Sequence, residues 1–269
     1  MTGSFDLNAY FDRIQWGDSV RHDLDTLTGL LRAHMRRIPF ENLDVLLGRP
    51  VQLDLAPIQD KLVRAARGGY CFEHATLFAA VLETLGFKPV RHTGRVVVAV
   101  PRTAAPRTHM FLTVALAEGV FVVDPGFGAL APRVPVPLLE GKRARIDDES
   151  HWMVRDDRYW ILHAQVGAKS AQAWASTAEE ENLVDFEMGN YFTSTHPSSP
   201  FVNRILMRAI TDDGRVTVMN REVTFWRGGA PEPAQLADRA ALRALLVEHF
   251  GFDLPQLDRL RVPSIPEWT

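Results

Sequence analysis

Apolar residues recur at helical spacing through the first third of the chain. Two amphipathic faces lie within residues 7–14 and 24–34, because apolar side chains three and four positions apart share one side of a helix. A third helix is predicted after Cys71, with a C-terminal stop at Gly86. The apolar positions of these helices are Leu7, Tyr10, Phe11, Ile14, Leu24, Leu27, Leu30, Leu31, Leu77, Phe78, Val81, Leu82 and Leu85.

From about residue 89 the pattern changes to short runs of β-branched and apolar residues, separated by Pro, Gly and Thr. Strands are predicted at residues 96–100, 110–116, 120–123, 151–154 and 159–163. Residues 167–182 are rich in Ala, Ser and Glu and have little apolar periodicity, which predicts a linker or an exposed segment. We therefore expect a small antiparallel barrel or sandwich between residues ~89 and ~200.

The C-terminal part mixes strand and helix patterns. Apolar runs predict a meander of strands, and an amphipathic run ended by Gly251 predicts a helix; the strand runs and the helix cover residues 201–210, 216–219, 223–226 and 236–250. A chain of 269 residues is at or beyond the size at which one hydrophobic core divides. We expect a helical domain over residues 1–88, a β-barrel domain over 89–200 and an α/β domain over 201–269.

Composition and charge narrow the classes of partner. The chain has 46% hydrophobic and 23% charged residues, and its formal net charge of −3 gives no reason to expect nucleic acid. Residues 1–7 lack the basic and apolar regions of a signal peptide, and no later run approaches the ~20 apolar residues of a membrane span. We expect a cytoplasmic protein without a membrane partner, and a free thiol suits that reducing compartment.

Cys71 is the only cysteine of the chain. It therefore cannot form an intrachain disulfide or supply the paired thiolates of a structural zinc site. Many free cysteines are inert and buried. Here, however, Gly68 and Gly69 precede the cysteine and a helix follows it, so the thiol lies where unpaired N–H groups and the helix dipole favour a thiolate. Cys71 is predicted to be a nucleophile.

A base and a residue to orient it are available on two neighbouring strands. His109 opens one apolar run and Asp124 closes the next, and the short link between the runs predicts a hairpin. A turn at Glu118-Gly119 would pair Thr113 with Asp124. His109 would then lie on the same face but four residues further along, so a bend or bulge must close the gap. The three residues fit the roles of nucleophile, base and orienter.

Each of these residues also has an ordinary structural interpretation. His109 could be a strand-end histidine bonded to backbone, and Asp124 could initiate a turn before Pro125 and Gly126. His74 is the alternative base, because it lies three residues after Cys71 on the same helix. It has no obvious carboxylate partner, so we interpret it as a helix-surface or packing residue.

With these residues in view, the chain resembles the arylamine N-acetyltransferases from about residue 7 to at least residue 226. Four motifs carry the resemblance: Arg-Arg-Ile-Pro-Phe-Glu-Asn-Leu-Asp at 36–44, Arg-Gly-Gly-Tyr-Cys-Phe-Glu at 67–73, Val-Asp-Pro-Gly-Phe-Gly at 123–128 and Asn-Tyr-Phe-Thr-Ser-Thr-His-Pro at 190–197. The chain departs from the common family pattern at Ala75 and Pro125, neither of which is a catalytic position. The last ~40 residues resemble the family only loosely.

The resemblance implies an α+β fold of three lobes, a helical bundle, a β-barrel and an α/β lid. It also implies a papain-like arrangement of Cys71, His109 and Asp124. The implied activity is the N-acetylation of arylamines and hydrazines by acetyl-CoA, through a ping-pong mechanism with an acetyl-cysteine intermediate. Acetyl-CoA would act as the acyl-donor substrate, with no metal or prosthetic group, and the enzyme would be a monomer or a homodimer.

Further site residues follow from the same resemblance. It places Phe40, Val96, Phe127 and Phe201 in the acceptor pocket, although core packing is the alternative for Phe40 and Val96. It places CoA beside Gly126, Phe127 and Gly128, where glycine permits close backbone approach. Arg67 is interpreted as a structural ion-pair partner and not as a phosphate contact.

Three other functions remain open from the sequence. The same triad serves thiol hydrolases and peptidases, which pass the acyl group to water. An amide synthase of secondary metabolism, a relative that closes macrolactams, would use the triad on enzyme-bound acyl chains. A non-catalytic binding module would be unaffected by the loss of the Cys71 thiol.

Overall fold

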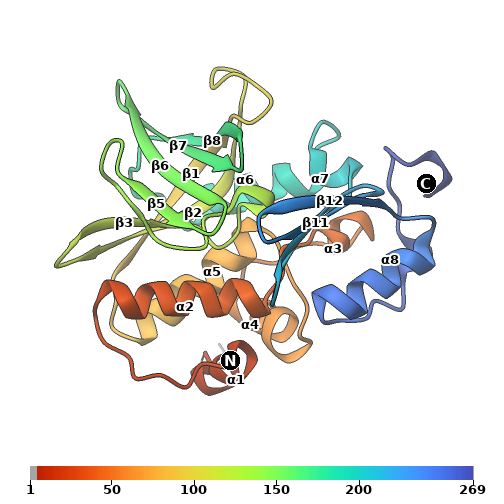
Figure 1. The fold of residues 1–269 in the computed structure, drawn as a ribbon, viewed down its shortest axis with the longest axis horizontal. Coiled ribbons are helices and arrows are strands. Elements are labelled where there is room, and N and C mark those ends of the chain that lie inside the picture. Colours follow the sequence, from red (N-terminus) through yellow and green to blue (C-terminus); the bar gives the residue numbers. More distant parts are fainter. Residues whose placement is uncertain (1–4, 269) are drawn as a thin grey trace.

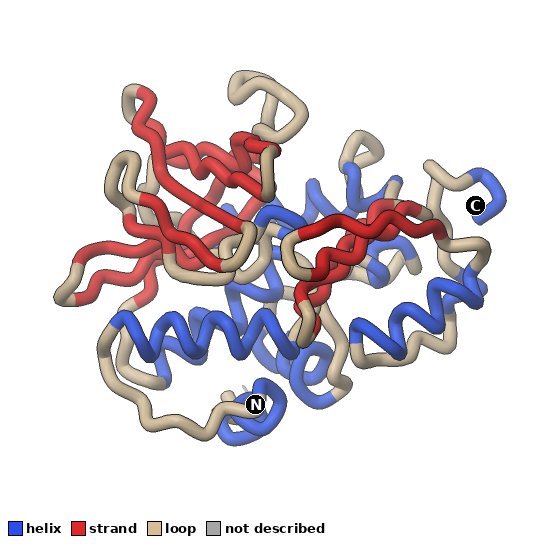
Figure 2. Tube along the Cα trace, viewed as in Figure 1, coloured by secondary structure: helices blue, strands red, loops and turns tan. Residues whose placement is uncertain are grey.

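A computed structural model describes residues 5–268 of the chain (Figure 1). The stretch 1–7, on which the expectation of no signal peptide rests, begins with four residues that lie outside the described ones. No helix within residues 5–268 is long and apolar enough to cross a membrane. Figure 2 shows that the strands form two separate groups, with helices below and between them.

The N-terminal part is helical, as predicted. Its elements are α1 (Leu7–Ile14), α2 (Leu24–Arg37), α3 (Leu43–Leu46), α4 (Leu55–Gln59), a π-helical turn (Asp60–Arg64) and α5 (Cys71–Thr84). The side chains of Asp6 and Asp23 accept backbone N–H groups at the starts of α1 and α2, which satisfies donors that a helix leaves free. Helix α5 runs between α2 and the β-barrel (Figure 1), and it is buried along most of its length. The nucleophile candidate therefore starts the central helix of the molecule.

Eight strands form one sheet in the order β4-β3-β2-β1-β8-β7-β6-β5. The two ends of the sheet approach each other, because β4 contacts β5 and β6, so the sheet is a nearly closed barrel. The strands are β1 (Pro89–Val96), β2 (Arg107–Leu116), β3 (Gly119–Val123), β4 (Val136–Pro137), β5 (Arg143–Ile146), β6 (Glu149–Asp156), β7 (Tyr159–Val166) and β8 (Lys169–Ser176). Phe111, Met153, Leu162 and Trp174 are among the side chains that fill its interior.

Two predictions for this region are wrong. The apolar run 96–100 is a strand only at Val96, and the chain then leaves the sheet, with Val98 50% exposed. On one side the run has lost its partner strand, because β2 begins at Arg107, which pairs with Arg95. On the other side the last contact with β8 is the hydrogen bond from Val97 N to Ala173 O at 3.0 Å. The predicted linker contains β8, whose small residues Ala173 and Ala175 are buried beside Trp174. Alanine gives little hydrophobic signal, and a bulge in the pairing of β7 with β8 further disturbs the alternation.

The C-terminal part is the predicted meander with one strand more. Its sheet has the order β12-β11-β10-β9, and its elements are β9 (Leu206–Thr211), β10 (Gly214–Met219), β11 (Glu222–Arg227), β12 (Ala230–Gln235), α8 (Arg239–Leu245) and a π-helical turn (Leu246–Phe250). We call this sheet the lid sheet. Strand β12 is exposed throughout and contains two prolines, which suits an edge strand and leaves no alternating pattern to predict it from.

Two helices between the sheets escape the sequence pattern. Helix α6 (Leu183–Thr195) exposes Leu183, Met188 and Tyr191, so its apolar residues do not mark one buried face. Helix α7 (Pro200–Asn203) occupies the start of the run that the sequence predicts as a strand. The predicted order of helices, barrel and mixed α/β part is nevertheless confirmed.

Phe40 ties the lid sheet to the helical part through its backbone. Its N–H donates to Arg208 O of β9 and its carbonyl accepts from Arg208 N, both at 2.9 Å. The neighbouring Glu41 N–H donates to Gly69 O at 2.8 Å, and Gly69 N–H donates to Pro39 O at 3.2 Å. The glycine loop before Cys71 and the lid sheet are thus both hydrogen bonded to one segment of the helical part.

Candidate active site

Cys71 is the first residue of α5. The loop that precedes it has room only for glycine at position 68. A Cβ on Gly68 would lie 2.2 Å from Pro39 O. The Glu73 carboxylate accepts the Tyr70 N–H at 3.1 Å, and the first helical hydrogen bond runs from His74 N to Tyr70 O. That helical ladder therefore does not use the N–H groups of Cys71 and Phe72, which makes this helix start suited to negative charge.

The structure brings the three predicted residues together. His109 Nε2 lies 2.8 Å from Asp124 Oδ2, and the Cys71 sulfur is near enough to His109 to contribute to the raised pKa of the imidazole. Because Nε2 faces the carboxylate, Nδ1 is the nitrogen available to the thiol. The side chains are nearly closed off from solvent, with Cys71 3%, His109 1% and Asp124 0% exposed. This order of contacts is the one expected of nucleophile, base and orienter.

The hairpin that joins His109 to Asp124 differs in register from the prediction. Its turn is Ala117-Glu118, since Leu116 pairs with Gly119, and Leu112 pairs with Val123. The predicted pairing of Thr113 with Asp124 is therefore wrong by two residues, and Asp124 lies that much nearer to His109. A bulge is also present, because β1 pairs Gly94 with His109 and Arg95 with Arg107, which leaves Thr108 without a partner in that ladder.

Asp124 is held by more partners than the sequence predicts. Trp174 Nε1 donates to Asp124 Oδ2 at 2.9 Å, and Gly126 N–H donates to Oδ1 at 3.3 Å. These hydrogen bonds fix the plane of the carboxylate. Trp174 escaped sequence reasoning because it lies in the segment predicted as a linker.

The electrostatics of His109 favour a charged imidazole. Burial alone would lower the pKa of His109, but the Asp124 carboxylate and the Cys71 thiolate together raise the pKa to about 9. An imidazolium beside the sulfur stabilises a thiolate. In the resting site His109 is therefore suited to carry its proton beside the Cys71 sulfur.

His74 does not pair with the thiol. Its ring points into the helical part, where His74 Nε2 lies 3.2 Å from Pro39 O and Nδ1 lies 2.8 Å from His34 Nε2. Tyr10 Oη completes the chain at 2.9 Å from His34 Nδ1. All donors and acceptors match if both rings are neutral, with each Nε2–H donating. His74 is thus a packing residue, as the sequence suggests, but it is buried and not on the helix surface.

Acid should destabilise the fold through this histidine pair. Burial lowers the pKa of His74 to about 4 and the pKa of His34 well below its usual value. Since an unfolded histidine titrates near ~6.5, only the unfolded chain gains these protons as the pH falls below that value, and stability then falls by roughly 3 kcal/mol for His74 alone by pH ~4. Urea midpoints measured between pH 7 and 4.5 should show this loss and show less of it in His74→Gln. Parallel curves for the two proteins would contradict this assignment.

Three of the four predicted pocket residues, Phe40, Phe127 and Phe201, pack in the same apolar cluster as Cys71. The Phe127 ring meets the His109 ring edge-on with centroids 4.7 Å apart, and the Phe40 and Phe201 rings are 6.2 Å apart. Phe201 also lies 5.4 Å from the Tyr70 ring. Val96 ends β1 opposite Trp174, at the Asp124 side of the site.

The two glycines of the predicted CoA loop are close to their neighbours. A Cβ on Gly126 would lie 2.6 Å from Cys71 Cα, and one on Gly128 would lie 3.1 Å from the Phe40 ring. Gly128 also has a φ of +70°, a conformation that side chains disfavour. The loop therefore packs directly against the nucleophile's backbone.

Arg67 is an ion-pair partner, as predicted. Its guanidinium contacts Glu41 Oε1 at 2.6 Å and Asp44 Oδ1 at 3.4 Å. Lys61 joins the same cluster through Asp44 and Glu73, at 2.8 Å each. Since Glu73 also holds the Tyr70 N–H, this buried cluster supports the loop that presents Cys71.

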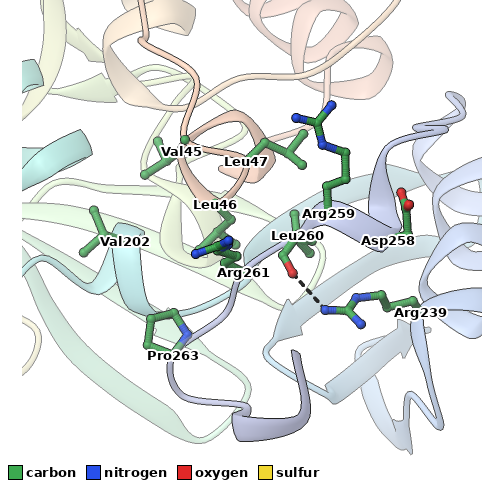
Figure 3. A pocket seen from close by; sticks show the side chains of 11 residues that line it. Val45, Leu46, Leu47, Val202, Arg239, Asp258, Arg259, Leu260, Arg261 and Pro263 are labelled. Atoms are coloured by element: carbon green, nitrogen blue, oxygen red, sulfur yellow. Dashed lines mark hydrogen bonds between the residues drawn. The ribbon is translucent and has the colours of Figure 1, made fainter. Parts of the chain in front are cut away.

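A cavity of about 710 Å³ lies away from this site (Figure 3). It is bounded by α3, α7 and the segment 258–263, and Arg239 at its edge donates to Leu260 O at 2.9 Å. None of Cys71, His109 and Asp124 lines it. Within residues 5–268, no three His, Cys, Asp or Glu side chains gather as metal ligands would.

Comparison with known proteins points to one family. The N-acetyltransferase family model matches residues 23–259. The chain is 38% identical over 262 residues to the arylamine N-acetyltransferase of Mycobacterium tuberculosis, covering 94% of this chain and 92% of the relative. It is 38% identical over 251 residues to the Escherichia coli protein of the same name, covering 91% and 88%. The solved structure of Mycobacterium marinum arylamine N-acetyltransferase in complex with CoA superposes with a TM-score of 0.89 at 35% identity, covering 95% of this chain and 97% of that one.

Proposed function

The chain belongs to the arylamine N-acetyltransferase family, and on that premise we propose that it transfers acetyl groups from acetyl-CoA to arylamines and hydrazines through Cys71. The proposal rests mainly on the buried arrangement of Cys71, His109 and Asp124. Cys71 begins α5 and influences the pKa of His109, and His109 is hydrogen bonded to Asp124. The relative solved with CoA supports the donor. The names of the relatives support the acceptor class.

The first half-reaction loads the enzyme. The Cys71 thiolate attacks the thioester carbon of acetyl-CoA, and the oxyanion of the tetrahedral intermediate accepts the Cys71 N–H at the helix start. The C–S bond to CoA breaks, and the departing sulfur takes the proton of the His109 imidazolium. Exchange of one thioester for another is nearly thermoneutral, so the acetyl group remains activated on the enzyme.

The second half-reaction needs His109 as a base. The amine nitrogen attacks the acetyl carbon, His109 accepts the amine proton, and Cys71 leaves as the thiolate, which regenerates the resting pair. Acetylation removes the negative charge of Cys71, which is one of the influences that raise the pKa of His109. The imidazole therefore holds a proton less tightly before this step, and Asp124 stabilises the imidazolium that forms.

The acceptor pocket suits a neutral aromatic amine. The rings of Phe40, Phe127 and Phe201 supply apolar and edge-on contacts near the thiol. An arylamine is uncharged at neutral pH, so it needs no carboxylate to bind it. Val96 completes our proposed pocket from the β1 side, and the segment Gly126-Phe127-Gly128 lies where CoA would pass.

We assign the nucleophile to a domain of residues 1–88, His109 and Asp124 to a domain of residues 89–200, and the lid to residues 201–269. We also propose that the enzyme acts in the cytoplasm, where a free thiol stays reduced, as a monomer or a homodimer.

Brief incubation with acetyl-CoA tests the function. Intact-protein mass should show one added acetyl group together with a burst of released CoA, and the group should leave when an aromatic amine is added. Release of CoA at a steady rate without amine would indicate a hydrolase. Failure to turn over with any arylamine or hydrazine would favour the amide synthase.

Substitution of Gly126 by alanine should reduce acetyl transfer by about 100-fold, because even a 1 Å misplacement near a reacting group has this order of effect. The new Cβ would lie 2.6 Å from Cys71 Cα, a backbone atom that cannot rotate away. Steady-state rates with acetyl-CoA and an arylamine measure the loss. Gly17→Ala is the matched control, because nothing lies within 4 Å of its Cβ position. Equal rates for both variants would show that the close approach is not needed.

A further inference from the structure

A buried ionic cluster joins the lid sheet to the barrel. Arg208 of β9 contacts Glu149 of β6 at 2.7 Å, and Arg215 of β10 forms two contacts with Asp148, at 2.7 and 2.8 Å. Arg215 Nε lies 3.2 Å from Glu149, and Arg133 pairs with the same carboxylate. Three guanidiniums therefore face the carboxylates of Glu149 and Asp148 where the lid sheet meets the barrel.

Arg208 does more in this cluster than pair with a carboxylate. Its Nη1 donates to Gly128 O at 3.0 Å and to Ala131 O at 2.8 Å. The residue is 3% exposed, so these hydrogen bonds are shielded from water. Residues 128–131 are the turn that directly follows Phe127, and we call them the Gly128 turn.

His151 holds the same turn from the barrel side. Its Nε2 donates to Leu130 O at 3.0 Å, while its Nδ1 is buried without a partner among residues 5–268. That arrangement requires the neutral ring, because a second N–H would be buried and unsatisfied. Burial correspondingly lowers the pKa of His151 to about 4. Three carbonyls of one turn are thus occupied by two buried side chains from two different sheets.

The segment before the Gly128 turn faces the reacting groups. Phe127 packs edge-on against His109, Gly126 lies against the Cys71 backbone, and Gly128 lies against the Phe40 ring. Phe40 is in turn hydrogen bonded through its backbone to Arg208. A shift of the turn would therefore move the wall of the pocket without breaking the contact of His109 with Asp124.

From these contacts we infer that Arg208 and His151 are positioning residues for acetyl transfer, which hold the Gly128 turn so that Gly126 and Phe127 keep their place beside Cys71. This inference rests on the proposed function for its kinetic consequence, but not for its structural one. Loss of Arg208 leaves Glu149 paired with Arg133 and Asp148 paired with Arg215, so neither carboxylate is left without a guanidinium. The carbonyls of the turn lose their donor.

The first comparison pairs Arg208→Met with Arg215→Met. Both residues lie on the lid sheet and both contact Glu149, but only Arg208 donates to the turn. We expect Arg208→Met to lower kcat/KM for acetyl-CoA by about 10- to 100-fold, while Arg215→Met stays near the wild type. Alkylation of Cys71 by iodoacetamide should be unchanged in both variants, because the small reagent does not need the pocket wall. Arg208→Lys keeps the charge but replaces two donor nitrogens, Nη1 for the two carbonyls and Nη2 for Glu149, with a single ammonium, so it should resemble Arg208→Met.

The second comparison leaves the ionic cluster intact. His151→Gln keeps a donor for Leu130 O and should retain activity, whereas His151→Leu should lose it. Amide hydrogen exchange of a peptide spanning residues 125–133 should quicken by about 10-fold or more in Arg208→Met and His151→Leu, since hydrogen bonds to charged or buried groups are worth at least that factor. This readout does not depend on catalysis.

The outcomes separate the two proposals. If the wild type is never acetylated on Cys71, the proposed function is wrong, and hydrogen exchange alone decides the role of the turn. Equal losses of kcat/KM and equal exchange in Arg208→Met and Arg215→Met would overturn the inference, because Arg208 would then act only through the ionic cluster. The inference would also be overturned if His151→Leu matched His151→Gln in both kcat/KM and hydrogen exchange.

Discussion

Replacing Cys71 with alanine will abolish acetyl transfer and leave the fold intact. The thiol is the only cysteine sulfur in the chain, so no other thiol can carry the acetyl group. Its hydrogen bond to Thr108 O is long, at 3.8 Å, and alanine is readily accommodated in a helix. Intact-protein mass after exposure to acetyl-CoA should show no adduct, and the free energy of unfolding should stay within about 2 kcal/mol of the wild type.

The same variant reports on the pairing with His109. Because the thiolate contributes to the raised pKa of His109, its removal should lower that pKa, which NMR titration of the imidazole can measure. Cys71→Ser is the matched control for packing, since it keeps a polar atom of similar size while losing most of the nucleophilicity. A stable acetyl adduct in Cys71→Ala would place the acyl carrier elsewhere, and full activity in that variant would leave only a non-catalytic role for the thiol.

The parts of the site that the sequence predicts are those that depend on nearby residues. Cys71 at a helix start follows from two glycines and an apolar period that all lie within 20 residues. The partnership of His109 with Asp124 follows from one short hairpin. The register of this hairpin could not be fixed from the sequence, because both Ala117-Glu118 and Glu118-Gly119 can form a two-residue turn. Moving the turn from one pair to the other shifts the partner of every residue in the first strand by two positions.

The parts that escape prediction depend on contacts between distant segments. Trp174 reaches Asp124 across 50 positions, and Arg208 reaches Gly128 across 80. Neither residue carries a local pattern, and β8 around Trp174 is predicted as a linker because the buried residues on either side of Trp174 are alanines. In the lid sheet, β12 likewise could not be predicted, because its two prolines break the strand pattern. Its partner β11 is predicted from its own apolar run. Hydrophobic periodicity predicts elements, and buried polar pairs then decide how the elements meet.

Asp124→Asn will reduce acetyl transfer by about 10³- to 10⁴-fold, the order found when the carboxylate of a catalytic triad is made neutral. The carboxylate accepts three N–H groups, from His109, Trp174 and Gly126. An asparagine has one oxygen for these donors and turns its own N–H groups toward at least one of them. The ring of His109 therefore loses both its charge partner and its fixed orientation.

The raised pKa of His109 also predicts how the stability of this variant changes with pH. In the wild type the pKa of His109 is about 9, above the value of ~6.5 for an unfolded histidine. Its proton therefore stabilises the fold fully below pH ~6.5, and the contribution is lost as the pH rises through about 9. In Asp124→Asn this alkaline loss of stability should shrink. Alkylation of Cys71 at neutral pH should slow as well, because a neutral imidazole no longer favours the thiolate.

Trp174→Phe is the matched control for Asp124→Asn. It removes one donor to the carboxylate but keeps the charge beside His109, so the loss of activity should be about 10-fold, the value of one hydrogen bond to a charged group. If Asp124→Asn lost no more than Trp174→Phe, the carboxylate would serve only as a structural acceptor. A larger loss of activity in Asp124→Asn than in Trp174→Phe would therefore show that catalysis by Cys71 and His109 needs the negative charge of Asp124. Equal losses would show that it needs only the hydrogen bonds that the side chain accepts.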